Sequence, residues 1–352
     1  MSFLAFQDDE PNYLIDTINQ LQMFYHHTYA PLGKFNSHNI FEIQAKDDVM
    51  IIADKNLVSP VCEMVKHGSL KDVLRMRKTA MFVLWGIYLN ARTTCGLGLL
   101  ENDTAGLSTV TGETTRKLFL HGINNVPSQI WKNIAFGYIS EIPKEFLYTS
   151  EDEVVEEETY ICNDDLLLLC NEAAMIKLVQ LIRTKNVSGI DKFITFMNWY
   201  ADNMDVAESV IVYAALVFCN AQNVSKPKFC DSKNYDKVVK GIKNQAWDLT
   251  YITQWSTMYY NETDQKKFIF ATDDITQKFI VANILPIGHC CENVYAAFET
   301  KSSHKKLDEI FNVKLGDTRI RTFKDKSKED NINTVRMLIS KEQDLLKAMI
   351  TA

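Results

Sequence analysis

The chain has 352 residues, of which 46% are hydrophobic, enough to form the core of one large globular domain or of two ordinary ones. With 24% charged residues and only 13 glycines and 7 prolines, the composition excludes collagenous, disordered and linker-dominated proteins. The formal net charge of −7 argues against a protein that binds nucleic acid over much of its surface. A local basic surface is compatible with this net charge.

The sequence shows no sign of a membrane span or a signal peptide. The longest uncharged apolar run, VIVYAALVFC at 210–219, is shorter than the roughly 20 residues that a spanning helix needs. The N-terminus, MSFLAFQDDEPN, lacks a basic segment and meets acids early. Eight cysteines are scattered without a CxxC pair, which is typical of buried free thiols in a reducing compartment. We therefore expect a soluble, cytoplasmic protein.

The first predicted elements are a helical segment at 1–45, a short apolar strand, VMIIA at 49–53, and a helix over about 70–90. That helix, LKDVLRMRKTAMFVLWGIYLN, carries apolar residues at spacings of three and four, which is the pattern of an amphipathic helix. The stretch CGLGLLEND at 95–103 follows and indicates a glycine-rich turn.

The middle of the chain, from about 115 to 235, predicts an α-helical block. Its clearest helices lie at 164–182, 189–203 and 206–222. A further helix is expected at about 240–260. After a polar break, the sequence KKFIFATDDITQKFI predicts a strand at 268–271 that leads directly into another helix.

Both predicted strands are apolar on both faces, and both run straight into acidic residues. Strands that are covered on both faces are typical of a parallel sheet between helices, so the predicted fold class is α/β. Ligands of such sheets bind at the carboxyl ends of the strands. We therefore expect Asp54 and the acidic pair Asp273 and Asp274 to lie on one edge of the sheet.

Two more carboxylates are candidates for the same site. Asp248 shares a helix face with Ile252 and Trp255, so an acid stands in the stripe that faces the core, and Glu101 follows an apolar run. Four carboxylates at one edge repel each other unless cations neutralise them, and an all-oxygen site prefers Mg²⁺ or Mn²⁺. Such ions activate water and stabilise charge on a phosphoryl group, which predicts hydrolysis of phosphodiester bonds.

Three motifs resemble those of PIN-domain nucleases and occur in the order of that family. IIADKNLV at 51–58 is similar to the family's opening strand that ends in D-x-N, NQAWDLTYI at 244–252 to its later helix with an aspartate near the start, and FIFATDD at 268–274 to its strand followed by T-x-D. The matching segments cover about a third of the chain. The resemblance implies a PIN-like parallel sheet flanked by helices, with a large α-helical insertion and a helical C-terminal segment.

The resemblance also implies a role for each matching residue. The catalytic acids, which would bind Mg²⁺ or Mn²⁺, are Asp54, Glu101, Asp248 and Asp274. Asn56 and Thr272 would orient them, and Asp273 is the alternative ligand to Asp274. Glu208, in DVAESVIVYAAL, is the alternative to Glu101, which is preferred because it precedes the insertion.

The domain organisation that the resemblance implies is discontinuous. An N-terminal helical segment covers 1–45, the PIN-like nuclease domain covers 46–112 and 236–300, the helical insertion covers 113–235, and a basic C-terminal segment covers 301–352. The insertion is required because Glu101 and Asp248 are 147 residues apart, far more than a loop of a compact domain spans.

The implied substrate is RNA rather than DNA, and the implied role is that of a toxin or antiviral defence effector, as for many members of the family. Residues 301–341 hold eight lysines and three arginines against six acids, and Arg319, Arg321 and Lys324 are expected to contact phosphates. An inhibitory or activating protein partner and a homodimer stay open. The acidic run EDEVVEEE at 151–158 is expected to be a solvated loop.

Two alternative interpretations stay open. RKLFLH at 116–121 has the R-x4-H spacing of helical HEPN ribonucleases, in which Arg116 and His121 would act on RNA without a metal. In the other, the same fold is a non-catalytic protein-interaction module, although such a module has no need of several carboxylates at one edge. Chelation by EDTA separates the two nuclease hypotheses, because it should abolish only the metal-dependent activity.

Overall fold

The computed structural model describes residues 6–7, 9–104, 112–149, 165–285, 290–315, 323 and 326–351. The chain divides into two units by its internal contacts. Unit 1 consists of Met1–Cys162 and Trp255–Asp274, and unit 2 of Asn163–Gln254 and Ile275–Ala352. Each unit is therefore made of two separate stretches of the sequence.

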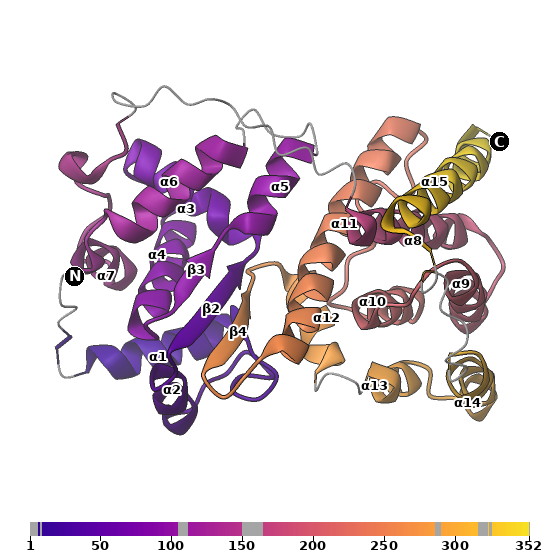
Figure 1. The fold of residues 1–352 in the computed structure, drawn as a ribbon, viewed down its shortest axis with the longest axis horizontal. Helices are drawn as coiled ribbons and strands as arrows, with labels where there is room; N and C mark the ends of the chain where they lie inside the picture. Colours follow the sequence, from indigo (N-terminus) through magenta and orange to yellow (C-terminus); the bar gives the residue numbers. More distant parts are fainter. Residues whose placement is uncertain are drawn as a thin grey trace. The chain divides into compact units, whose positions relative to one another are not determined.

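Unit 1 contains the sheet. In chain order, its elements are α1 (Glu10–Leu21), β1 (Phe24–Tyr25), α2 (Ser37–Gln44), β2 (Asp48–Ala53), α3 (Lys55–His67), α4 (Val73–Tyr88), β3 (Arg92–Thr94), α5 (Gly96–Thr104), α6 (Gly112–Asn124), α7 (Ser128–Phe136), the 3-10 turns η1 (Lys144–Phe146) and η2 (Tyr259–Asn261), and β4 (Lys266–Ala271). Helix α4 packs on α7 and α3 packs on α6, and Figure 1 shows these four helices together beside the sheet.

The sheet has the strand order β1-β4-β2-β3. Strand β2 is parallel to both β3 and β4, and only β1, at the edge, is antiparallel. Strands β2 and β4 pair without a break from Asp48 opposite Lys266 to Ala53 opposite Ala271. The predicted α/β class with a mainly parallel sheet flanked by helices is confirmed, and so are both predicted strands.

Both faces of the central strands are covered, as their apolar sequences predict. Ile51 and Ile269 point to the core that α3 and α4 share, where Gly86 of α4 lets the helix approach Ile51 closely. On the opposite face, Phe270 packs against the ring of Trp255, 5.7 Å between centroids. The Trp255 indole also donates a hydrogen bond of 3.0 Å to the Phe268 carbonyl. Within unit 1, one face of the sheet is thus covered by the core of α3 and α4, and Trp255 packs on the other face.

The described part of unit 2 consists of helices. They are α8 (Leu166–Arg183), α9 (Gly189–Asn203), α10 (Glu208–Phe218), α11 (Tyr235–Met258, which continues into unit 1), α12 (Ile275–Ile284), α13 (Cys290–Ala297), α14 (Lys301–Asp308), the π-helical turn η3 (Glu309–Lys314) and α15 (Lys328–Thr351). Helix α15 packs along α8, where the buried Glu342 accepts hydrogen bonds from Gln180 (2.9 Å) and Trp199 (3.1 Å). The predicted helices at 164–182, 189–203 and 206–222 correspond to α8, α9 and α10.

Several local features differ from the expectation. The glycine-rich stretch CGLGLLEND forms helix α5 instead of a turn, and α5 packs on α6. Helices α6 and α7 pack on α3 and α4 within unit 1, so the first part of the expected insertion at 113–235 lies with the sheet. The acidic run at 151–158 lies outside the described residues.

Candidate metal site at the carboxyl edge of the sheet

The carboxyl ends of β2 and β4 meet because the two strands end in register. The Asp54 amide extends the ladder by one hydrogen bond of 2.9 Å to the Ala271 carbonyl. The Thr272 amide donates to the Met23 carbonyl at 2.9 Å, which fixes the first residue after β4. Asp54 and Thr272 therefore lie side by side, although 218 residues separate them in the sequence.

Asp54 is held by side chains and not by a helix cap. It precedes α3, yet its side chain makes no capping hydrogen bond. Its Oδ2 accepts a hydrogen bond of 2.8 Å from the Thr272 hydroxyl and another from the Asn56 amide. The Asp54 side chain is buried at 3% exposure, so these two donors replace the water that the carboxylate loses.

Asn56 and Thr272 connect the two loops that follow the strands. Asn56 Nδ2 also lies 3.3 Å from Thr272 Oγ1, and Asn56 Oδ1 accepts a hydrogen bond of 3.1 Å from the Asp273 amide. Thr272 Oγ1 in turn accepts 3.1 Å from the Asp274 amide. Three of the four residues that the D-x-N and T-x-D motifs name, Asp54, Asn56 and Thr272, are thus joined by side-chain hydrogen bonds.

Glu101 and Asp274 add negative charge near Asp54. Burial raises the pKa of Asp54 to about 7; the Thr272 hydrogen bond opposes the shift, and the charges of Glu101 and Asp274 add to it. Glu101 stands on α5, and its position near β2 depends on the packing of that helix. These three predicted acids therefore share one electrostatic environment.

Two lysines, which the sequence analysis does not assign to the site, pair with its acids. Lys55 lies 3.2 Å from Glu101, and Lys78 of α4 lies 3.2 Å from Asp273. Lys55 is the middle residue of the D-x-N motif, so this motif alone could have identified it as a candidate site residue. Lys78 is 195 residues from Asp273 in the sequence, and no local pattern connects the two.

The other predicted residues of the metal-dependent nuclease belong to unit 2 or lie outside the described residues. Asp248 is on α11 in unit 2, where it accepts a hydrogen bond of 3.0 Å from Gln277. Glu208, the alternative to Glu101, begins α10 in unit 2. The predicted phosphate contacts Arg319, Arg321 and Lys324 lie outside the described residues.

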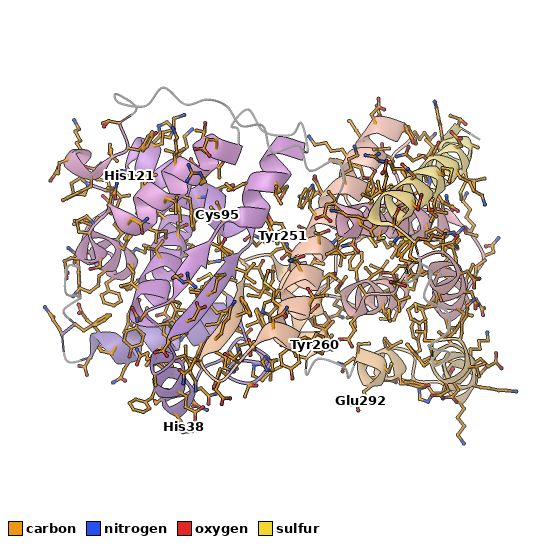
Figure 2. All side chains as sticks on the ribbon, in the orientation of Figure 1. His38, Cys95, His121, Tyr251, Tyr260 and Glu292 are labelled. Atoms are coloured by element: carbon orange, nitrogen blue, oxygen red, sulfur yellow. The ribbon has the colours of Figure 1, made fainter. Side chains whose placement is uncertain are left out.

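Arg116 and His121, the alternative pair for a metal-independent ribonuclease, both lie on α6 (His121 is labelled in Figure 2). Five residues apart on a helix, they are rotated from each other by about 140°. Arg116 donates two hydrogen bonds to Glu113, and His121 contacts the Phe146 carbonyl at 2.9 Å and the Asn125 amide at 3.2 Å. No observation in the described residues directs the two side chains toward one substrate atom.

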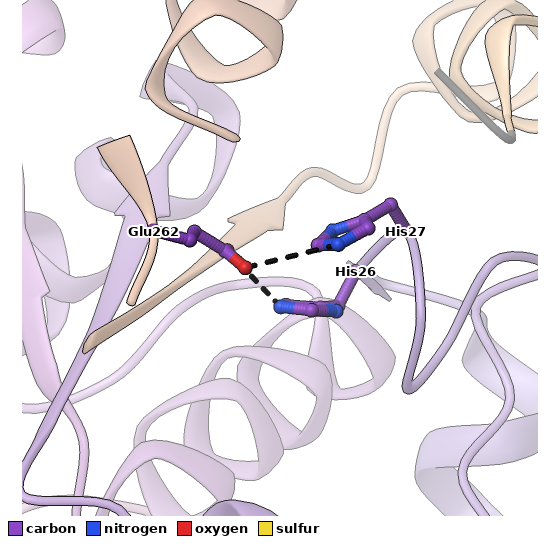
Figure 3. A group of neighbouring side chains, drawn as sticks. All are labelled: His26, His27 and Glu262. Atoms are coloured by element: carbon purple, nitrogen blue, oxygen red, sulfur yellow. Dashed lines mark hydrogen bonds and ion pairs between the residues drawn. The ribbon is translucent and has the colours of Figure 1, made fainter. Parts of the chain in front are cut away.

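A second cluster, formed by His26, His27 and Glu262, has the composition of a metal site (Figure 3). Among the described residues, it is the one group of three or more such side chains whose ligand atoms all lie within 4.8 Å of one another. His26 is fully buried, and its Nδ1 accepts hydrogen bonds from the amides of Thr28 (3.1 Å) and Tyr29 (3.2 Å). The proton of a neutral His26 therefore sits on Nε2, which donates to Glu262 Oε1 at 3.1 Å.

This tautomer opposes coordination by His26. A metal bound at Nε2 would require a proton on Nδ1, where two amide donors already point. Glu262 Oε1 also accepts a hydrogen bond of 2.9 Å from the Phe268 amide. We therefore interpret the cluster as a hydrogen-bonded clasp between the segment after β1 and the turn before β4.

The carboxyl edge of the sheet suits a hard cation by its donor set and its surplus of negative charge. The oxygens of Asp54, Glu101 and Asp274 do not meet the 4.8 Å condition as a group. Mg²⁺ usually keeps several water ligands and takes only one or two carboxylates directly. The arrangement thus fits an ion held by one or two of these acids, with water between it and the others.

Comparison with protein-family models gave no match, and neither did comparisons with curated proteins and with solved structures. No helix in the described part of the chain is long and apolar enough to cross a membrane. A proposal for the function of this chain therefore depends on the geometry of its side chains.

Proposed function

We propose that the protein is a metal-dependent nuclease of the PIN-like type that hydrolyses phosphodiester bonds in RNA. One observation carries the proposal. A buried aspartate at the carboxyl edge of a parallel sheet is held by an asparagine two residues on and by the threonine that ends the neighbouring strand. Glu101 and Asp274 add negative charge to the same region.

The charges at this edge explain why a cation belongs there. Asp54 is buried beside the negative charges of Glu101 and Asp274, and a carboxylate is rarely buried without a positive partner. Lys55 and Lys78 pair with Glu101 and Asp273. Mg²⁺ or Mn²⁺ bound by Asp54 and Asp274, with Glu101 acting directly or through water, would supply the missing positive charge beside Asp54.

The residues of the chain have separate roles in this proposal. Asp54 would bind the cation, and Thr272 and Asn56 would fix the direction of its carboxylate. When bound, the cation would activate a water molecule and stabilise charge on the phosphoryl oxygens. Lys78, at the surface beside Asp273, would attract the substrate phosphate. Asp248 remains a predicted ligand from the PIN resemblance.

The test is cleavage of labelled single-stranded RNA and DNA by the purified protein with Mg²⁺, with Mn²⁺ and with EDTA. We expect metal-dependent cutting of RNA and a loss of at least about 100-fold in the Asp54→Asn variant, because the variant loses a ligand charge. Asp47→Asn is the matched control, since Asp47 is exposed and lies just before the opposite end of β2.

The alternatives give different results in the same assay. Cutting that survives EDTA and Asp54→Asn would contradict the proposal and favour Arg116 and His121. Cutting of DNA but not of RNA would contradict the substrate assignment. Absence of cutting with both polymers and both metals would favour a protein-interaction module.

A further inference from the structure

The loop between α10 and α11 and the first turns of α11 are together strongly basic in a chain that is acidic overall. Residues 226–243 hold six lysines and two aspartates, a net charge of +4, while the whole chain has −7. The six are Lys226, Lys228, Lys233, Lys237, Lys240 and Lys243, and all six are exposed. We call residues 224–234 the lysine loop; the last three lysines continue from it along α11.

The backbone of the lysine loop is fixed by its surroundings in unit 2. Arg183 donates hydrogen bonds to the carbonyls of Cys230 (2.6 Å) and Ser232 (3.2 Å). Ser225 is held from both sides, because Tyr213 donates to its carbonyl at 2.9 Å and its amide donates to Thr276 at 3.1 Å. The loop therefore presents its side chains from a defined backbone.

Phe229, in the middle of the lysine loop, has an unusual backbone conformation. Its φ is 60°, in the left-handed region that a bulky side chain rarely adopts. Its ring is not buried in exchange, since the residue is 52% exposed. Pro227 and Cys230, on either side, are buried instead. A strained backbone that turns an aromatic ring outward indicates a functional constraint.

Positive charges of other elements lie close to the lysine loop. The backbone of Lys228 packs on α11 at Gly241, where an added Cβ would meet the Lys228 carbonyl at 1.7 Å; this brings Lys228 beside the helix that carries Lys240. From α9, Lys192 adds another charge: burial lowers its pKa, and the nearby charge of Lys226 lowers it further.

We propose that the lysine loop and the first turns of α11 form a binding surface for single-stranded RNA. Lys226, Lys228 and Lys240 would contact phosphates, and the Phe229 ring would stack on a base. Base stacking and phosphate contacts are the two interactions that hold single strands without sequence preference. The choice of RNA depends on the proposed nuclease function, whereas the surface itself does not.

The test measures binding separately from cleavage. The full-length Asp54→Asn protein, in EDTA, is titrated against a fluorescein-labelled single-stranded RNA of about 20 nucleotides, which covers more than one typical single-strand site, and fluorescence anisotropy is recorded over a series of salt concentrations. Phe229→Gly is added to this background, because glycine adopts a positive φ without strain. The variant should therefore fold at least as well as its parent.

We expect Phe229→Gly to weaken RNA binding by about 5-fold or more, the effect of losing one stacked base. Phe41→Ala is the matched control, since Phe41 on α2 is 72% exposed, and it should leave binding unchanged. Replacing Lys226, Lys228 and Lys240 together by Gln should reduce the slope of log affinity against log salt by about 2. The same replacement at the exposed Lys34, Lys66 and Lys144 changes the net charge equally and should leave the slope nearly unchanged.

Equal losses in the two lysine variants would overturn the proposal, because net charge alone would then explain binding. Unchanged affinity in Phe229→Gly, or no binding of RNA by the parent, would overturn it as well. Binding of phosphatidylserine vesicles instead of RNA would assign the surface to a membrane and contradict us. If RNA binds at this surface and the wild-type protein cuts nothing, only the nuclease function fails.

Discussion

At the scale of single residues, the Thr272 hydroxyl is the centre of the candidate site. It donates to Asp54 and accepts from the Asp274 amide, 2.8 and 3.1 Å away. Removing it would leave a buried carboxylate without one of its donors, and that carboxylate would turn more freely.

Thr272→Val and Thr272→Ser test this role. Valine has nearly the shape of threonine but no hydroxyl, and we expect it to reduce metal-dependent RNA cleavage by about 10- to 100-fold. Serine keeps the hydroxyl and should stay within about 3-fold of the wild type. Single-turnover cleavage rates give the comparison. A valine variant that cuts as fast as the wild type would show that Thr272 does not orient the site.

Asp54 is expected to reduce the stability of the protein without a metal. The pKa of an aspartate in an unstructured chain is 3.8, and burial raises that of Asp54 to about 7 in the folded protein. Well below pH 3.8 it is protonated in both the folded and the unfolded states, so it does not change the free energy of unfolding. As the pH rises toward 7, the unfolded state loses the proton first, and the free energy of unfolding decreases.

Asp54→Asn should therefore raise the melting temperature at pH 8 in EDTA by at least about 3 °C and change it little at pH 4. Differential scanning calorimetry at the two pH values measures this effect, with Asp47→Asn as the exposed control. A lower melting temperature for Asp54→Asn at pH 8 would contradict it.

At the scale of elements, the hydrogen bond between His26 and Glu262 joins the segment after β1 to the turn before β4. Glu262 accepts from the His26 ring and from the Phe268 amide at the start of the buried part of β4. Burial would raise the pKa of Glu262, but the hydrogen bonds from the His26 ring and the Phe268 amide, together with the nearby His27 ring, lower it below its usual value. The carboxylate thus remains charged and accepts both hydrogen bonds.

Glu262→Ala leaves these two buried donors without an acceptor and should lower the free energy of unfolding by about 1–3 kcal/mol for each. Glu42→Ala removes a similar pair with His38 on α2, where both side chains are exposed, and should change stability by less than about 1 kcal/mol. Chemical denaturation measures both. A melting temperature that rises with Zn²⁺ in the wild type, but not in Glu262→Ala, would show that the cluster is a metal site.

Many of the helices and strands could be predicted from the sequence. Short runs that are apolar on both faces identified β2 and β4, and helical spacing identified α4, α8 and α9. Strands β1 and β3 have only two and three residues, too few for a periodic pattern. Helix α5 was not predicted, because its two glycines suggested a turn. Its packing on α6 is not visible in the sequence.

The part of the candidate site that directly follows the predicted strands could be predicted together with those strands. Asp54, Asn56 and Thr272 could be placed together because parallel strands end at one edge. The lysine partners and the distribution of the acids over two units depend on packing between distant segments. Charge alone does not distinguish the lysine loop from the basic segment at 301–341, and the positive φ of Phe229 arises only in the folded backbone.

At the scale of the whole molecule, the chain order of unit 1 has a consequence for folding. Strand β4 lies between β1 and β2 in the sheet but follows the first segment of unit 2 in the sequence. A protein that ends at residue 162 lacks this central strand, so its sheet cannot form.

We expect the fragment 1–162 to show no near-ultraviolet circular dichroism of packed aromatic rings and rapid digestion by protease. Joining residues 255–274 to it through a flexible linker of roughly 20 residues should restore both properties, because the added segment supplies β4 and Trp255. A fragment 1–162 that resists protease without β4 would show that the sheet is dispensable for unit 1.

The same order matters while the chain is being made. A ribosome adds about 5–20 residues per second, and 218 residues separate Asp54 from Thr272. The carboxylate and the hydroxyl that holds it are therefore synthesised roughly 10 to 40 s apart. During that interval one edge of β2 has no partner strand, and an acidic cluster able to bind metal cannot assemble. The proposed nuclease would therefore stay inactive until the segment that carries β4 and Thr272 had left the ribosome.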